Sequence, residues 1–459
     1  MASLKKFREW IDQHRADLRD DYFAFLRFRS ISSEPEFKSE VERCADWVKE
    51  YLQASGFKTE LIATQRYPIV YAEDLHAPGK PTVLIYGHYD VQPVDPLELW
   101  KNDPFEPTER SGKVFARGAV DDKGQIFYAM AAMRALKENG GALPINVKFC
   151  IEGEEEDGSV GLSGALSKIQ QKLKADFLLV VDHGAYDEKT PAINLGARGM
   201  LTMDVKLTGS KSDLHSGEYG GIAYNPNRAL VELLAKLYDS NGRVAVDGFY
   251  DDVIEPSSED KKAFAHAGDA ASYAREYGIE ALGGEKGRTI QEANLFRPVL
   301  EINGIGGGYH GPGFKTVIPA MAIAKLSCRL VPGQDPKKIS RQITDFLHRH
   351  CVKGMKLDVH VHAGAPAYRA NPASELANAV AAAAEEVTGQ PCKRVLTGAS
   401  IPIVASLSQT IGAEIVGMGY GLPTDLIHAP NENFDFSRLE KGLLTVARAM
   451  ELLTQGAKR

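Results

Sequence analysis

The 459-residue sequence contains no long apolar run, and its start does not resemble an export signal. No stretch approaches the ~18 apolar residues that a membrane-spanning helix requires. The opening segment, MASLKKFREW, is charged and amphipathic, and it lacks the apolar core and small-residue cleavage site of a secretory signal. We therefore expect a cytoplasmic protein with no membrane partner.

Cysteine and positive charge are also scarce. The five cysteines are odd in number and never spaced as CxxC, which argues against disulfides and thiolate zinc sites and predicts reduced, buried thiols. The net charge is −7, and no stripe interleaves Lys and Arg with aromatic residues, so nucleic acid is not an expected partner. The glycine run GIGGGYHGPG is too irregular for a phosphate loop, and GxxxxGK[ST] is absent. Small molecules remain as the expected ligands.

The length and the order of apolar patterns predict two domains. Residues 4–30 and 41–52 have helical periodicity. Short apolar strands are expected at 81–91, 145–151 and 177–181, with a helix-like segment, FYAMAAMRALKENGG, between the first two. This alternation is typical of an α/β sheet, in which ligands bind beyond the carboxyl ends of the strands.

After Arg198 the pattern changes to an order close to β-α-β-β-α-β, which predicts an inserted α+β domain of the ferredoxin-like type. The expected boundaries are 1–198 and 368–459 for the two parts of the main domain and 199–367 for the insert. Residues 247–297 have little periodicity, so we predict a loop excursion of the insert there.

Acidic and histidine residues follow the expected strand ends. In GHYDV, His88 and Asp90 would point the same way from an extended strand, with His88 as a metal ligand and Asp90 as the carboxylate that fixes its tautomer. A satisfied surface pair is the alternative. Asp121 and Asp122 lie in a Gly-flanked turn ahead of an apolar helix, where they are either helix caps or, beside His88, candidate ligands.

Three further groups extend this pattern. In EGEEEDGS a turn could aim Glu155 and Glu156 at different parts of one site, one binding metal and the other taking a proton from water; a solvated charged loop is the alternative. Asp182 follows the strand FLLVV, and His428 lies in the loop LPTDLIHAPNENF. Together with a hydroxide, three such carboxylates would neutralise two divalent cations, which favours an enclosed metal site.

The motifs GHYDVQP, ARGAVDDKG, EGEEEDGS, VVDHG, DLHSG, CRLVPG, GASIP and IHAPNE occur in this order over nearly the whole chain. As a set they resemble the M20 family of metallopeptidases, and above all its dipeptidase branch. The resemblance implies a mixed-sheet, zinc-peptidase-like catalytic domain with an inserted lid and dimerisation domain. It also implies two divalent ions per chain, with zinc favoured over manganese or cobalt.

The resemblance implies a role for each residue of the main domain. His88 and Asp182 would hold one ion, Glu156 and His428 the other, and Asp121 would bridge them. Glu155 would be the general base, and Asp90 would orient His88. A cis peptide bond is expected between Asp121 and its neighbour Asp122.

Other implied roles concern the substrate. His215 in DLHSG would donate to the developing oxyanion, either in its own chain or across a homodimer formed through the lid. Arg329 and Thr316 match lid residues that bind the C-terminal carboxylate of the substrate, and Ser400 matches a contact from the main domain. One departure is visible: Ala399 stands where relatives often carry glycine.

The expected function is therefore metal-dependent hydrolysis of the peptide bond in dipeptides or short peptides. Asp at position 182 favours a dipeptidase, since several carboxypeptidases and deacylases of the family have Glu there. An N-acyl amino acid deacylase on the same site is the first alternative. A noncatalytic metal-binding protein is the second, although it would have no use for Glu155 as a base.

Overall fold

The computed structural model describes residues 2–264, 269–362, 364–397 and 402–456. The chain forms two compact units. The first comprises Met1–Gly196, Ala370–Val395 and Ile403–Arg459, and the second comprises Ala197–Arg369 and Leu396–Pro402. Within the described residues we find no helix whose length and apolar character would let it span a bilayer.

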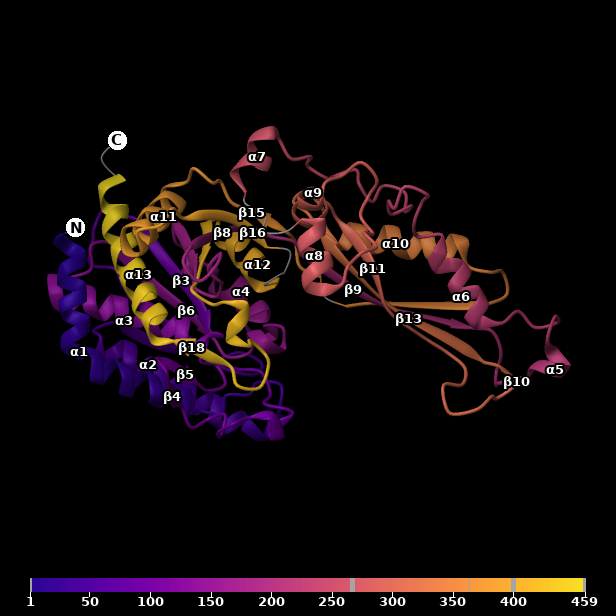
Figure 1. The fold of residues 1–459 in the computed structure, drawn as a ribbon, viewed down its shortest axis with the longest axis horizontal. Helices are drawn as coiled ribbons and strands as arrows, with labels where there is room; N and C mark the ends of the chain where they lie inside the picture. Colours follow the sequence, from indigo (N-terminus) through magenta and orange to yellow (C-terminus); the bar gives the residue numbers. More distant parts are fainter. Residues whose placement is uncertain (1, 265–268, 363, 398–401, 457–459) are drawn as a thin grey trace. The chain divides into compact units, whose positions relative to one another are not determined.

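The first unit is an α/β structure, and many of its elements are labelled in Figure 1. The elements that lie wholly or largely in it are α1 (Ala2–Leu26), η1 (Pro35–Phe37), α2 (Lys38–Ala54), β1 (Lys58–Ile62), β2 (Ile69–Asp74), β3 (Thr82–His88), η2 (Leu97–Leu99), β4 (Thr108–Arg110), β5 (Lys113–Phe115), α3 (Lys123–Gly140), β6 (Asn146–Glu152), η3 (Glu155–Asp157), α4 (Val160–Leu173), β7 (Phe177–Val180), β8 (Ala192–Ala197), α11 (Glu375–Thr388), β16 (Lys393–Thr397), α12 (Pro402–Ile411), β17 (Glu414–Met418), η4 (Pro423–Asp425), β18 (Asn433–Asp435) and α13 (Phe436–Gly456).

Its main sheet is mixed, which confirms that part of the expected fold class. The strands follow the order β1-β2-β6-β3-β7-β17-β8. Strands β6, β3, β7 and β17 are parallel to one another, whereas β1 pairs antiparallel with β2, β2 with β6, and β8 with β17. The parallel strands are buried almost throughout, as expected for strands covered on both faces. Their carboxyl ends therefore meet at one edge of the sheet.

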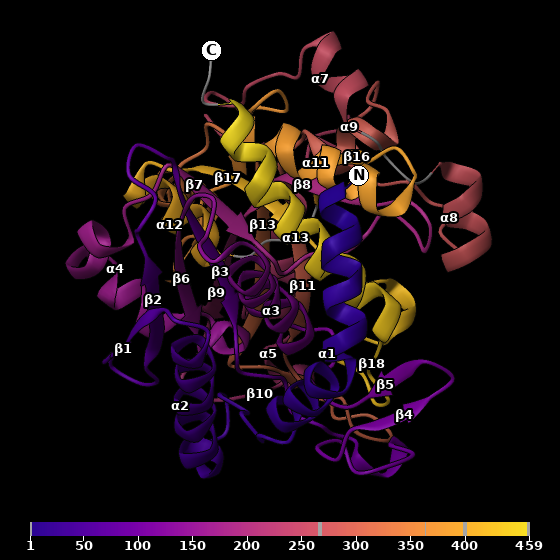
Figure 2. The same ribbon diagram turned by 90° about the vertical axis from the view of Figure 1, so that its left-hand side faces the viewer.

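Helices α1, α3, α11 and α13 pack against one another, and α3 and α11 contact strands β3 and β17. Figure 2 shows α1, α3 and α13 side by side. Helix α3 is buried along most of its length, because the run GQIFYAMAAM offers small and apolar side chains on every face. It begins at Lys123, directly after the turn that carries Asp121 and Asp122.

The second unit is an α+β structure. Its elements are β9 (Gly199–Thr208), β10 (Leu214–His215), α5 (Ser216–Tyr219), α6 (Pro226–Ala235), α7 (Ser258–Ala263), α8 (Ala270–Tyr277), α9 (Ile290–Leu295), β11 (Val299–Gly306), β12 (Val317–Ile318), β13 (Met321–Leu330), α10 (Pro336–His350), β14 (Lys356–Val361) and β15 (Tyr368–Arg369). Strands β9, β11, β13 and β14 with helices α6 and α10 have the order β-α-β-β-α-β.

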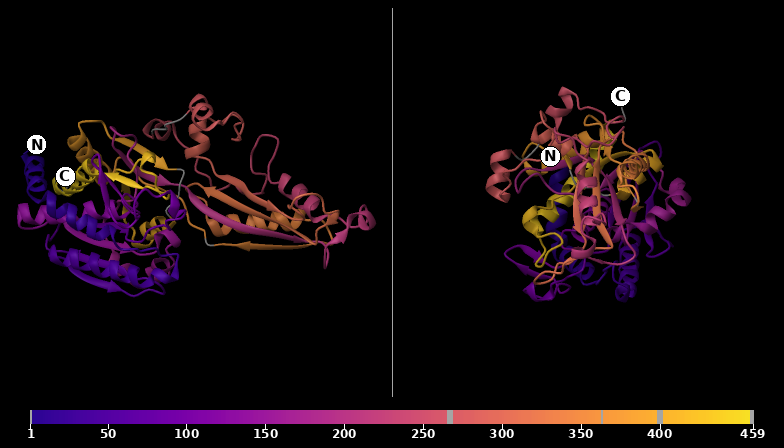
Figure 3. Two further views of the ribbon diagram at one scale, coloured as in Figure 1. Left: turned by 60° about the horizontal axis from the view of Figure 1, so that its bottom comes forward. Right: turned by 90° about the vertical axis from the view of Figure 1, so that its right-hand side faces the viewer.

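These four strands form an antiparallel sheet in the order β11-β13-β9-β14. Figure 3 (left) shows the magenta strand β9 among the orange strands of this sheet, where its neighbours are β13 and β14. Alternate residues of β9, from Leu201 to Leu207, enter a core shared with α6 and α10. The other face of β9 carries polar residues such as Asp204 and Lys206, as the period of two dictates.

The expectation of a structureless excursion at 247–297 was wrong, because this stretch contains α7, α8 and α9. Each of these short helices begins with a capping box, at Ser257, Asp269 and Thr289. Such a box satisfies backbone donors locally, so a helix can form without a long apolar stripe. Helices of six to eight residues contain only about two turns, which is too short to show a repeating apolar pattern in the sequence.

Candidate metal centre and active site

The candidate ligands of the main sheet lie at the carboxyl ends of its parallel strands. His88 is the last residue of β3 and is paired with Glu152, the last residue of β6. Glu155 and Glu156 open the turn η3 just after β6, and Asp182 follows β7 by two residues. The register of three buried strands thus brings together residues that are almost a hundred positions apart in the sequence.

Two loops complete the arrangement. Asp121 precedes α3, and the peptide bond between Asp121 and Asp122 is cis, as the resemblance implied. Asp122 occupies the N-cap position of α3, but its carboxylate accepts a hydrogen bond from the backbone N–H of His88 at 3.0 Å instead of capping the helix. His428 follows η4 and has a φ of 60°, a left-handed conformation that turns the loop sharply.

The side chains form two groups that share Asp121, and each group could hold a metal ion. In the His88 group (His88, Asp121, Asp182), His88 Nε2 lies 3.2 Å from Asp121 Oδ1 and 3.8 Å from Asp182 Oδ2. In the His428 group (Asp121, Glu156, His428), His428 Nε2 lies 2.9 Å from Asp121 Oδ2 and 3.2 Å from Glu156 Oε1. The two oxygens of Asp121 therefore face different groups.

Asp90 connects His88 to the turn that carries the two glutamates. Its carboxylate accepts the backbone N–H groups of Glu155 and Glu156, each at 3.1 Å, and the hydroxyl of Ser32 at 2.6 Å. One of its oxygens lies 3.3 Å from His88 Nδ1, which also contacts the backbone oxygen of Asp90 at 3.1 Å. His88 and Asp90 are both fully buried, so the surface-pair alternative is wrong.

Glu155 and Glu156 are neighbours with different surroundings. Gln92 donates to Glu156 Oε2 at 2.8 Å, while Glu156 Oε1 faces His428. The Glu155 carboxylate makes no hydrogen bond or ion pair with any residue that the structure describes. Burial raises the pKa of Glu155 well above its ordinary value. The solvated-loop alternative for EGEEEDGS is wrong in large part, since Glu152 and Glu154 are 1% exposed.

The electrostatics of the site favour cations. Burial raises the pKa of Asp182 to about 7, and the charge of Asp121 adds to this effect. The adjacent carboxylates of Asp121 and Glu156 raise the pKa of His428 to about 10. The protein groups thus retain protons at neutral pH to balance crowded carboxylates. Divalent cations would balance the same charge more completely.

The chemistry of the donor set fits metal binding. Imidazole nitrogen and carboxylate oxygen are the ligands that zinc, manganese and cobalt accept in proteins. Glu156 Oε1 is buried and accepts no hydrogen bond within the described chain, although the opposite oxygen of the same carboxylate is held by Gln92. A buried oxygen of this kind, aimed at an imidazole and a second carboxylate, is suited to a cation.

The expected substrate residues belong to the second unit. His215 and Thr316 lie close together, because β10 pairs with β12 and Ser216 donates its N–H to the oxygen of Thr316 at 3.0 Å. Both side chains are exposed. Arg329 lies on β13 near Arg198, whose pKa falls to about 10 through burial and the charge of Arg329. Ser400 and Ala399 lie outside the described residues.

Four residues that contact the site were not found from the sequence: Ser32, Gln92, Arg117 and Glu432. Gln92 lies two positions after Asp90 in GHYDVQP, and Glu432 lies four positions after His428 in IHAPNE, so the motifs contained a signal for these two. Arg117 is likewise the second residue of the motif ARGAVDDKG, whereas no local pattern distinguishes Ser32 from other polar residues.

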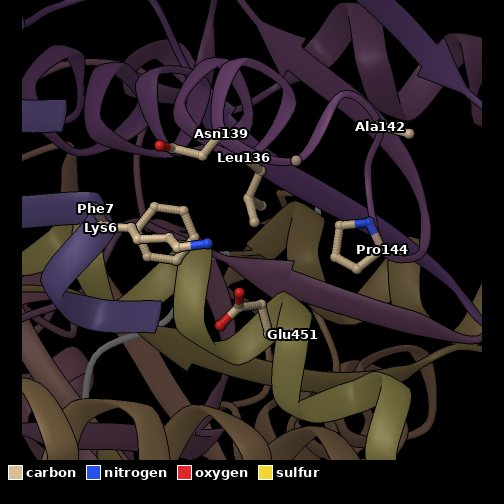
Figure 4. A pocket seen from close by; sticks show the side chains of 8 residues that line it. Lys6, Phe7, Leu136, Asn139, Ala142, Pro144 and Glu451 are labelled. Atoms are coloured by element: carbon tan, nitrogen blue, oxygen red, sulfur yellow. The ribbon is translucent and has the colours of Figure 1, made fainter. Parts of the chain in front are cut away.

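A cavity elsewhere in the first unit lacks this chemistry. Lys6 and Phe7 of α1, Leu136 of α3 and Glu451 of α13 line it, together with the loop that leads into β6 (Figure 4). Its volume is about 330 Å³. It lies toward the amino end of β6, whereas Glu155 and Glu156 follow the carboxyl end. None of the candidate ligands lines it.

The first unit is thus an α/β structure with a histidine and carboxylate centre at the carboxyl edge of its sheet, the arrangement of a metallohydrolase. Comparison with known proteins identifies the class further. The model of peptidase family M20/M25/M40 matches residues 84–452. The chain belongs to this family, as its motifs predicted, and is a hydrolase of the metallopeptidase type.

Several relatives have similar sequences over nearly their whole length. A human Beta-Ala-His dipeptidase is 32% identical over 95% of this chain and 89% of the relative. A Cys-Gly metallodipeptidase of Schizosaccharomyces pombe is 30% identical over 96% of both chains. Among solved structures, an M20 family metallo-carboxypeptidase from Sulfolobus solfataricus has a TM-score of 0.86 at 32% identity, over 95% of this chain and 99% of that one. Human carnosine dipeptidase 1 has a TM-score of 0.80 at 30% identity, over 98% and 99%.

Proposed function

We propose that the protein hydrolyses the peptide bond of dipeptides or short peptides with two divalent ions, zinc by preference. The single observation that carries this proposal is the pair of ligand groups sharing Asp121, beside a glutamate with no partner in the described chain. The names of the relatives, a Beta-Ala-His dipeptidase and a Cys-Gly metallodipeptidase, support dipeptides as the substrate class.

The ligand assignment follows the two groups. His88 and Asp182 would hold one ion and Glu156 and His428 the other, with Asp121 bridging. The separate orientation of the two Asp121 oxygens supports the bridge. When bound, the ions would lower the pKa of water and polarise the carbonyl of the scissile bond.

Glu155 would be the general base. Its carboxylate would accept a proton from water and deliver it to the nitrogen of the leaving amine. A raised pKa suits this exchange, because the group must both take and release a proton near neutral pH. Glu156 is unsuited to the role of base, because Gln92 donates to its Oε2 and its Oε1 faces His428.

Asp90 would orient His88 and hold the turn of the two glutamates. Its contacts to His88 Nδ1 leave Nε2 directed at Asp121 and Asp182. This is the usual task of a carboxylate behind a metal-bound imidazole, where it fixes both the tautomer and the ring orientation. The same carboxylate fixes the backbone of Glu155, so one residue would position a ligand and the base.

Residues 199–367 would form the lid and the dimerisation domain. His215 would donate to the oxyanion, and Arg329 and Thr316 would bind the substrate carboxylate. His215 and Thr316 are exposed on and beside the two-stranded sheet of β10 and β12, which would let them contact a substrate or a second chain. Phe314 and Ile222, near Thr316 and His215 in the sequence, are 102% and 81% exposed, and a homodimer contact would bury such apolar side chains.

A cytoplasmic location is the remaining part of the proposal. The five cysteines, including the buried Cys44 and Cys150, form no disulfide. Reduced thiols are typical of proteins kept in the reducing interior of the cell.

A matched substrate set tests the proposed reaction. The purified protein, reloaded with zinc, manganese or cobalt, is offered a dipeptide, the same dipeptide N-acetylated, an N-acetyl amino acid, and an N-acetylated tripeptide. A dipeptidase should cleave only the free dipeptide rapidly. Preference for the N-acetyl amino acid bond would indicate the deacylase alternative, and release of the C-terminal residue from the blocked tripeptide would indicate a carboxypeptidase. No cleavage of any substrate with any of the three metals would contradict an enzymatic role.

A further inference from the structure

Glu432 is a buried carboxylate that the proposed reaction does not use. It is 1% exposed and lies four residues after His428. Its two oxygens accept hydrogen bonds from three backbone N–H groups of the turn before α3: Gly118 at 2.9 Å, Val120 at 2.9 Å and Asp121 at 3.1 Å. A carboxylate that satisfies three donors of one turn restricts the conformation of that turn.

Arg117 completes the arrangement from the other side. Its guanidinium donates to Glu432 Oε2 at 2.8 Å, to the oxygen of Pro93 at 2.9 Å and to the oxygen of Ala429 at 3.4 Å. Pro93 adjoins Gln92, which holds Glu156, and Ala429 adjoins His428. The buried pair of Arg117 and Glu432 therefore joins the segments that carry Asp121 and His428 to the segment of Gln92, whose side chain donates to Glu156.

We propose that Glu432 is a positioning residue for metal binding, which holds the backbone of Asp121 and fixes its distance from His428 through Arg117. This inference rests on the metal centre of the proposed function. Glu432 would do for Asp121 what Asp90 does for Glu155 and Glu156, namely accept the backbone N–H of the residue that carries the functional side chain. Removing a residue that supports a metal ligand in this way commonly weakens metal affinity by ~10-fold to 100-fold.

The test is a direct measurement of metal binding by the full chain. Wild type, Glu432→Gln and Asp74→Asn are stripped of metal and titrated with zinc by equilibrium dialysis against a competing chelator, and with cobalt by visible absorption. Glutamine keeps the size of the side chain, but its amide nitrogen cannot accept the N–H of Gly118 or the guanidinium of Arg117. We expect one or both ions to bind ~10-fold to 100-fold more weakly in Glu432→Gln.

Asp74→Asn is the matched control. Asp74 is a buried carboxylate of the same unit, paired with Lys137 at 2.7 Å, and it lies at the opposite end of β2 and β6 from the metal groups. Loss of the Asp74 charge in this variant should lower the melting temperature but leave the affinity for both ions within ~2-fold of wild type. An equal loss of metal in Asp74→Asn would show that general destabilisation explains the effect, and it would overturn the inference.

A double variant covers the case in which Glu432→Gln does not fold, because that variant leaves the buried Arg117 without its carboxylate. Arg117→Met with Glu432→Gln removes both charges and should fold, yet still bind metal more weakly. Wild-type affinity in either folded variant would overturn the inference while leaving the proposed function intact. A wild-type chain that binds no divalent ion would overturn the proposed function itself, and this inference with it.

Discussion

The different surroundings of Glu155 and Glu156 allow a sharp prediction about two adjacent residues. Both follow β6 and both donate a backbone N–H to Asp90, so substitution at either position leaves the same backbone support in place. The Glu156 carboxylate contacts Gln92 and His428, whereas that of Glu155 has no partner in the described chain. Glu155→Gln should therefore remove a proton acceptor, and Glu156→Gln should remove a ligand.

The expected magnitudes differ accordingly. General acid and base catalysis commonly contributes ~10²-fold to 10⁴-fold, or about 3 to 5 kcal/mol of the activation barrier, so kcat of Glu155→Gln should fall by that factor. The variant should keep both ions and bind dipeptide. In Glu156→Gln an amide replaces the charged oxygen that lies 3.2 Å from His428, so the ion of that group should bind more weakly. Its activity should recover in part when metal is added in excess.

The assay measures metal content and kcat on the same preparations. Each variant is dialysed against a fixed concentration of free metal, its bound metal is determined by elemental analysis, and its dipeptidase rate is then followed at rising metal concentration. Normal turnover by Glu155→Gln would refute its role as the base. Loss of metal from Glu155→Gln but not from Glu156→Gln would mean that the two roles must be exchanged.

Further predictions concern other parts of the chain. His215→Ala should keep the fold and both metals but lose on the order of 10²-fold in kcat, the effect of removing one oxyanion donor, and an unchanged kcat in steady-state assays would rule that role out. If donation crosses a dimer, hybrids of His215→Ala with Glu155→Ala chains should regain part of the activity, and verified hybrids without recovery would place His215 in the site of its own chain. Zinc affinity, measured by calorimetric titration, should fall as the pH is lowered from 8 to 6. The reason is that zinc must displace protons from His428, with a pKa of about 10, and from Asp182, with a pKa of about 7. A zinc affinity that does not change with pH would contradict this expectation. In the second unit, hydrogen bonds from Lys261 and the backbone of Thr289 lower the pKa of Glu292 to about 2, so its stabilising contribution should be complete above the unfolded value of about 4.3 and lost as pH falls toward 2. The difference in melting temperature between wild type and Glu292→Gln should shrink over that range, and a constant difference would argue against the ion pair.

Much of the fold could be predicted because the local signals were strong. The apolar run PTVLIYGHYDV predicts a buried strand at 81–91, and β3 occupies most of this range but ends earlier, at His88. Helix α3 was expected from the small and apolar residues after the DDKG turn. The short helices of 247–297 could not be found by periodicity, because each is too short to show a stripe and depends on its caps.

Part of the candidate site was predictable as a set of residues, because His88, Glu156 and Asp182 lie at or just after strand ends and parallel strands present those ends at one edge. The sequence by itself determined the central strands β3, β6 and β7, the main helices and the identities of His88, Asp121 and His428 as candidates. Tertiary structure alone decided which oxygen of Asp121 faces which histidine, and that Glu432 supports the Asp121 turn from more than three hundred residues away in the sequence. The physical reason is that a hydrogen bond between distant segments depends on the packing of the whole unit, and no local pattern of residues encodes it.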